Sequence, residues 1–132
     1  MEIKSLAPIL ALLFFVIFVS FITFKDVDVS KSKKIWIFPA VLSILFLIFS
    51  LFAVITEGSL GFWSEHTRSL WGNQIWFDLL FAASIGWFLV IPRIKAVEMN
   101  PLLWLILVVS TGCIGFLAMI SRMLYLEEKI SD

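Results

Sequence analysis

The sequence has little charge, one cysteine and one histidine. Only 15% of its 132 residues are charged, against about a quarter in a typical soluble domain. A single cysteine cannot form an internal disulfide, and no zinc-type cluster, phosphate-binding glycine loop or nucleophile elbow is present. Basic and acidic side chains balance at ten each, so the chain lacks the basic surface that nucleic acids require. We therefore predict no nucleic-acid partner and no metal site, and nothing identifies a cofactor.

What the sequence has instead is apolar surface. Hydrophobic residues make up 61% of the chain, which includes 14 Phe and 6 Trp, and the mean hydropathy is +1.06. A water-soluble domain of this length has too little interior to bury so many apolar side chains. The composition predicts an integral membrane protein, because lipid is the solvent that accommodates it.

Four apolar runs are long enough to cross a bilayer as helices, which takes about 20 residues. They do not alternate in the way that barrel strands do. A cleaved signal peptide is the alternative for the first run, but no small-residue cleavage site follows it. Asn100 and Pro101 are typical of a helix start. We predict one all-α transmembrane domain over residues 1–132, a four-helix bundle with spans at about 6–24, 35–56, 74–92 and 101–121.

The distribution of Lys and Arg predicts the orientation. With four spans, loops 25–34 and 93–100 share one side, which carries six basic residues, and the opposite side carries four. The positive-inside rule places these two loops in the cytoplasm and both termini outside. The predicted location is the inner membrane of a bacterium.

Asp78 is the strongest candidate for a functional residue, because a carboxylate inside an apolar span is costly and often functional. The alternative is a structural partner for Arg122, which follows the last span and could equally extend towards the headgroups. Asp78, Arg122 and His66 are the candidate catalytic residues, although a lone loop histidine is more often a surface residue. Candidate ligand-binding residues at the same predicted interface are Glu57, Arg68, Trp71, Asn73 and Gln74.

Two further patterns have both functional and structural interpretations. Ser43, Ser50 and Glu57 are spaced by seven and could line a hydrated path, or the serines could bond to their own helix. The connection 57–73 could form a short interfacial helix, acting either as a lid over a lipid-accessible pocket or as a simple anchored link.

The second half of the chain resembles a family of small bacterial four-helix membrane proteins of unknown function. The resemblance lies in FDLLFAASIGWF (77–88), RIKAVEMN (93–100) and PLLWLILVVSTGCIGFLAMISRMLYLEE (101–128). It implies four helices with an aspartate early in the third. A looser similarity to the neoxanthin-synthase-like membrane proteins of carotenoid metabolism implies an isoprenoid ligand. This chain departs from their pattern at STGCIGF, which lacks the usual proline.

Three functions therefore compete. The first is a non-catalytic protein that binds a membrane lipid, an isoprenoid or carotenoid, or a membrane partner, either another subunit or a second copy of itself. The second is a membrane enzyme acting on an apolar isoprenoid-type substrate, with Asp78 as acid or base and Arg122 or His66 assisting. The third is an oligomeric pore for protons or small ions, because four helices are too few for most carriers.

Overall fold

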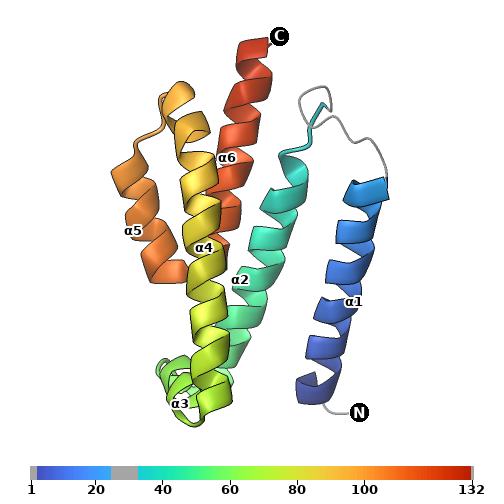
Figure 1. The fold of residues 1–132 in the computed structure, drawn as a ribbon, viewed down its shortest axis with the longest axis vertical. Coiled ribbons are helices and arrows are strands. Elements are labelled where there is room, and N and C mark those ends of the chain that lie inside the picture. The colour runs from blue at the N-terminus through green and yellow to red at the C-terminus, as the bar shows by residue number, and fades with distance from the viewer. Residues whose placement is uncertain (1–2, 25–32, 132) are drawn as a thin grey trace. The chain divides into compact units, whose positions relative to one another are not determined.

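The computed structural model describes residues 3–24 and 33–131. In these residues every regular element is a helix, and the chain divides into two compact units, 1–33 and 34–132. Figure 1 labels the helices, which are α1 (Ile3–Phe24), α2 (Ile37–Glu57), α3 (Gly61–Thr67), α4 (Leu70–Ala96), α5 (Pro101–Thr111) and α6 (Cys113–Ser131).

The first unit contains one helix, α1. It is apolar along its length, and the aromatic rings of Phe14 and Phe18, one turn apart, stack with centroids 5.7 Å apart. Residues 6–24 form a candidate membrane span, as predicted. The predicted loop 25–34 lies outside the described residues except for its last two positions.

In the second unit, sequence signals set the ends of the long helices. Pro39 lies in the first turn of α2, where its missing N–H removes no helical bond. The Ser69 side chain caps α4 by accepting from the backbone N–H of Gly72. Helix α4 ends in a Schellman motif: Glu98 adopts φ 58°, and Met99 N–H donates to the Ile94 carbonyl at 3.1 Å.

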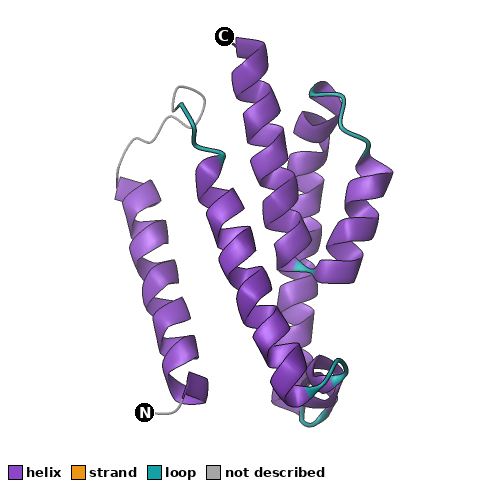
Figure 2. Ribbon diagram, turned by 180° about the vertical axis from the view of Figure 1, so that it is seen from behind, coloured by secondary structure: helices purple, strands orange, loops and turns teal. Residues whose placement is uncertain are grey.

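The predicted fourth span is wrong, because residues 101–121 do not form one continuous helix. Asn100 caps α5, as expected, by accepting from Leu102 N–H at 3.0 Å. However, α5 ends at Thr111 after 11 residues, a length of about 16 Å. The chain then reverses at Gly112, and α6 returns alongside α5, as Figure 2 shows with a short loop at the tip.

The hydrogen bonds that join α2 to α6 demonstrate the reversal. Ser43 lies beside Ile114, Trp36 beside Ser121, and Lys34 beside Glu128. The position on α2 therefore falls as the position on α6 rises, and the two helices are antiparallel. In the same way α6 runs parallel to α4, because Gly86 lies against Phe116 and Arg93 binds Glu127.

Gly112 makes this turn possible. Its backbone angles are φ 62° and ψ −130°, a combination open essentially to glycine alone. The turn also brings α5 and α6 very close at Gly115, where an added Cβ would lie 2.8 Å from the Leu107 carbonyl oxygen. Small residues at this approach allow the two helices to pack as a hairpin.

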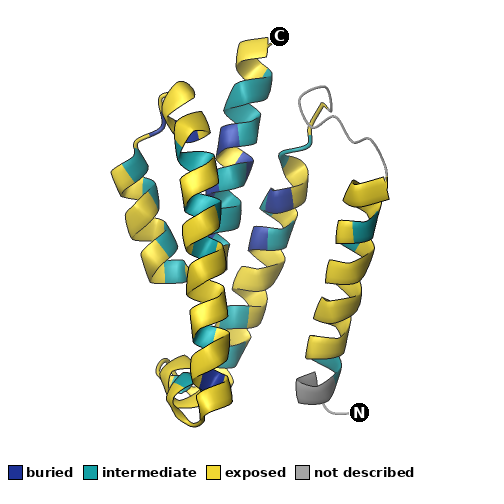
Figure 3. Cartoon of the chain, viewed as in Figure 1, coloured by how far each residue is buried: buried dark blue, intermediate teal, exposed yellow. Residues whose placement is uncertain are grey.

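The buried core lies around the hairpin. Buried residues lie near the start of α2, near the end of α4 and on α6 between Gly115 and Met123 (Figure 3). Met119, Met123 and Ile94 are almost fully buried, and Trp87, Trp104 and Phe116 pack around them. We call this part of the second unit the hairpin half; it comprises residues 34–44 and 86–131.

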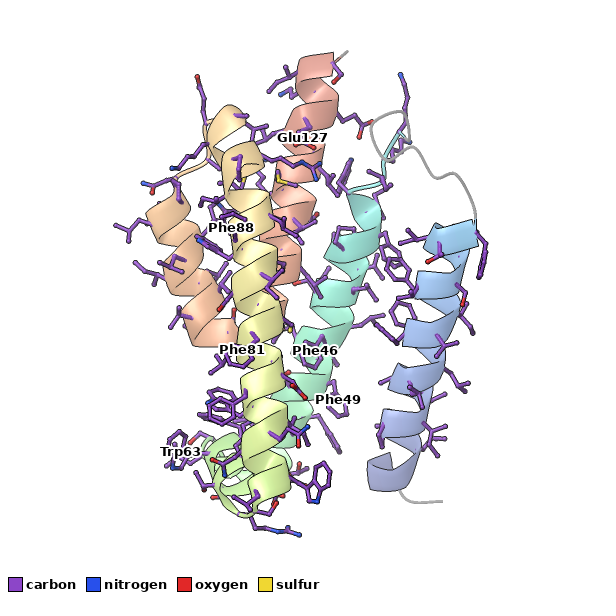
Figure 4. The ribbon with its side chains drawn as sticks, viewed as in Figure 1. Phe46, Phe49, Trp63, Phe81, Phe88 and Glu127 are labelled. Carbon is purple, nitrogen blue, oxygen red and sulfur yellow. The ribbon has the colours of Figure 1, made fainter. Side chains whose placement is uncertain are left out.

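We call the other described part of the second unit, residues 45–85, the α3 half. Here only Gly72 is buried. Large aromatic side chains on both long helices, including Phe46, Phe49 and Phe81, are between 42% and 64% exposed (Figure 4). Within this unit these helices present apolar surface of the kind that lipid or another helix covers.

Three helices of the described chain are long and apolar enough to cross a membrane: α1, α2 and α4. The prediction of four spans is therefore wrong. The residues predicted to form the fourth span belong to the hairpin of α5 and α6. The described residues are those of an all-helical protein of membrane type.

Candidate functional site

An open, mainly apolar groove lies between α2 and α6. Its volume is about 430 Å³, within the range of small-molecule sites. Because α2 and α6 are antiparallel, the N-terminal turns of α2 form one wall and the middle of α6 forms the other. The lining residues are Trp36, Ala40, Ser43, Ile44, Ala118, Ser121, Arg122 and Tyr125; we call this the α2–α6 groove.

Two serines hold the walls of the groove together. The buried Ser43 hydroxyl donates to the Ile114 carbonyl oxygen at 2.9 Å, and the buried Ser121 hydroxyl donates to the Trp36 carbonyl oxygen at 2.9 Å. Hydrogen bonds between helices replace the hydrophobic driving force that lipid does not supply. Both hydroxyl protons are therefore used in the contact between α2 and α6.

Arg122 gives the groove one charged group. Its guanidinium lies 5.5 Å from the centroid of the Tyr125 ring, which in turn meets Trp36 edge-to-face at 5.4 Å. Among the described residues no carboxylate pairs with Arg122. Arg122 is exposed and lines the groove near the end formed by Trp36 and Tyr125.

The same end of the unit has a polar rim. Arg93 at the end of α4 binds Glu127 on α6 through two hydrogen bonds of 2.9 and 2.6 Å. Glu128 accepts the Lys34 backbone N–H at 3.1 Å. Both glutamates of α6 are therefore engaged and do not neutralise Arg122.

Asp78 lies elsewhere. It is exposed on α4, and it has no hydrogen-bond or ion-pair partner in the part of the chain that the structure describes. Because α4 and α6 are parallel with Gly86 beside Phe116, Asp78 and Arg122 lie about 20 Å apart along the helix axes. The structure does not bring together the pair that the four-span arrangement suggested.

The third candidate catalytic residue, His66, lies on α3. Its ring packs against Trp76 with centroids 4.7 Å apart. The Asn73 amide donates to the His66 and Ser69 carbonyl oxygens at 3.1 and 3.0 Å, so Asn73 joins α3 to α4. The prediction of a short helix in the 57–73 connection is confirmed, because α3 (Gly61–Thr67) is a helix.

The other candidate ligand-binding residues also lie at the α3 end. Arg68 pairs with Glu65 at 3.3 Å, and both side chains are mostly exposed. Trp71, Gln74 and Glu57 are exposed as well. In those residues no group of three His, Cys, Asp or Glu side chains is placed to hold a metal.

Sequence reasoning missed the groove. Ser43 was noted only as part of a stripe with Ser50 and Glu57, yet it ties α2 to α6. Trp36 and Ser121, 85 positions apart, have no local signal that pairs them. Their contact depends on the reversal at Gly112, which places the α6 residues beside the start of α2.

No family model, no curated protein and no solved structure matches the chain.

Proposed function

We propose that this protein is a non-catalytic membrane protein that binds an amphipathic lipid in the α2–α6 groove. The observation that carries the proposal is the groove itself, which is mainly apolar and is lined by one exposed arginine. A lipid or isoprenoid chain would lie against Ala40, Ile44 and Ala118, with its polar end beside Arg122. Small alanine side chains leave the space that an acyl or prenyl chain fills.

Lipid retention tests the proposal. The full chain is purified in mild detergent, and co-purified lipid is quantified by mass spectrometry. We expect about one retained lipid per chain, lost in Ala118→Phe, whose ring fills the groove. The matched control is Ala82→Phe, because Ala82 is exposed on α4 away from the groove. Wild-type protein without lipid, or equal loss in both variants, would overturn the proposal.

The enzyme hypothesis receives no support from the geometry. It requires Asp78 to act with Arg122 or His66 on one substrate. Arg122 lies about 20 Å away along the helix axes, and His66 packs on Trp76. The pore hypothesis is weakened as well, because the Ser43 hydroxyl is used in a helix contact.

We also propose an orientation. If α1, α2 and α4 cross the membrane and the hairpin returns to its side of entry, the C-terminus lies with loops 25–34 and 93–100. Arg122 and Lys129 then join the six basic residues of that side, which makes eight, and only Lys4 and Arg68 remain opposite. The positive-inside rule places this side in the cytoplasm. The N-terminus would lie outside a bacterial inner membrane, the location implied by the resemblance of residues 77–128.

Reporter fusions decide between the two topologies. A phosphatase that is active only outside the cytoplasm is fused to either end of the chain. Three spans predict activity from the N-terminal fusion and none from the C-terminal one. Equal behaviour of the two fusions would restore four spans and refute the proposed orientation.

A further inference from the structure

We infer that the α2–α6 groove selects phospholipids with a net negative headgroup, and that the Arg122 guanidinium binds the headgroup phosphate. The inference rests on the proposed lipid-binding function and adds the chemical class of the ligand. It follows from three observations: the difference in polarity between the two ends of the groove, the pairing of the glutamates near Arg122, and the surplus of basic residues around Arg122.

The two ends of the groove differ in polarity. Ser43 lies seven residues after Trp36 on α2, which places it about 10 Å deeper. At that depth the Ser43 hydroxyl proton is already donated to the Ile114 carbonyl, so the deep wall offers an acyl chain no competing donor. At the shallow end Arg122 and Tyr125 are the polar groups. This arrangement matches an amphiphile with its head at the shallow end.

Arg122 is the one cation that lines the groove, and no carboxylate pairs with it among the described residues. Glu127 is occupied by Arg93 through two bonds, and Glu128 accepts a backbone N–H from Lys34. Arg122 instead stacks beside Tyr125, which holds the guanidinium plane without neutralising it. A guanidinium binds phosphate through paired N–H donors, so a phosphate ester is the complementary group.

The surrounding charge favours a net negative headgroup over a zwitterionic one. Basic residues at this end of the described unit outnumber acidic residues by five to three: Lys34, Arg93, Lys95, Arg122 and Lys129 against Glu98, Glu127 and Glu128. Each such cation attracts anionic lipid. A zwitterionic headgroup carries its own ammonium group, which this surplus repels. We therefore commit to an anionic phospholipid as the occupant.

The experiment measures lipid preference by native mass spectrometry of the full chain in detergent. The probes are phosphatidylglycerol and phosphatidylcholine with identical acyl chains. We expect the wild type to bind phosphatidylglycerol roughly tenfold more tightly, a difference of about 1.4 kcal/mol, because the basic surplus repels the ammonium group that only phosphatidylcholine carries. Arg122→Gln should abolish this preference, and Arg122→Lys should retain part of it.

Lys129→Gln is the control, because Lys129 has the same charge at the same end but does not line the groove. It should keep most of the preference. Equal binding of both lipids by the wild type would refute the inference and leave the lipid-binding function intact. Binding of neither lipid would refute both. Equal losses in Lys129→Gln and Arg122→Gln would show general attraction and overturn the role of Arg122, provided that both variants melt as the wild type does.

Discussion

The hairpin half and the α3 half of residues 34–132 share the same two long apolar helices, yet only the hairpin half has a core. In the hairpin half α6 packs against α2, α4 and α5, and Met119 is completely buried. In the α3 half the same α2 and α4 continue with exposed aromatic faces. The difference arises because the hairpin turns back at Gly112 and places no helix beyond its tip.

This contrast shows what packing within lipid requires. Hydrocarbon gives no hydrophobic force to join helices, so contacts form where small residues and hydrogen bonds permit close approach. Gly86, Gly115 and Ser43 provide such contacts in the hairpin half. In the α3 half the described cross-helix hydrogen bonds come from Asn73, which joins α3 to α4 but does not connect either to α2.

The largest expected effect comes from Gly112→Ala. Nothing within 4 Å would meet the added Cβ, but φ 62° with ψ −130° is strained for any side chain, by roughly 1–3 kcal/mol. Alanine also favours a continuous helix over residues 101–121. We expect a C-terminal phosphatase fusion to gain activity outside the cytoplasm as the hairpin opens into a fourth span.

The control for this prediction is Gly61→Ala. Gly61 begins α3 with no positive φ, and its added Cβ meets only an ordinary contact at 3.5 Å. It should leave the fusion unchanged. A Gly112→Ala chain with an unmoved C-terminus and an unchanged melting temperature would show that this glycine does not determine the turn.

The second prediction compares a buried side chain of the hairpin half with an exposed side chain of the α3 half. Met119→Ala should lower the free energy of unfolding in detergent by roughly 2 kcal/mol, the low end for a buried Met truncation, because Met119 is 0% exposed. Phe81→Ala removes a larger side chain that is 64% exposed and should change it by less than about 0.5 kcal/mol. Thermal unfolding followed by circular dichroism measures both, and equal losses would contradict the division into two halves.

The third prediction concerns the ion pairs of the two halves. The Arg93–Glu127 pair is bidentate and links two helices, but its side chains are 48% and 31% exposed. Solvent screening therefore limits its coupling energy to about 0.5–1 kcal/mol in a double-mutant cycle. The Arg68–Glu65 pair, with side chains 76% and 62% exposed within three residues, should give less. The reverse order would refute this ranking.

The smallest expected effect is that of Asp78→Asn on stability. Asp78 has no partner within the described residues, so the substitution breaks no contact there and should move the melting temperature by less than a degree or two. Cross-linking in membranes, run alongside, measures association with a second copy or another subunit. A large loss of stability in purified protein would reveal a contact that Asp78 makes within its own chain.

Much of the helical content could be predicted from the sequence, because runs of about 20 apolar residues show where helices form in lipid. The first three predicted spans correspond to α1, α2 and α4. The cap at Asn100 and the place of Pro39 followed from local chemistry. These features depend only on residues close in the sequence, so the sequence alone predicts them.

The reversal at Gly112 could not be read in the same way. Hydropathy measures length but not direction, and residues 101–121 have the length of one span. Glycine is common within transmembrane helices, so Gly112 in STGCIG gives no distinctive signal. The groove could not be predicted either. Trp36 and Ser121 meet only because the chain reverses at Gly112.

The hairpin has a consequence for how the chain enters the membrane. A fourth span over residues 101–121 would place Arg122, the two glutamates and Lys129 on the far side of the membrane, against the positive-inside preference for the two basic residues. In the proposed topology, the α5–α6 hairpin enters and leaves the membrane on the cytoplasmic side, so the charged tail stays in the cytoplasm. On the proposed three-span topology, insertion of the last quarter of the protein, residues 101–132, requires no translocation of that tail.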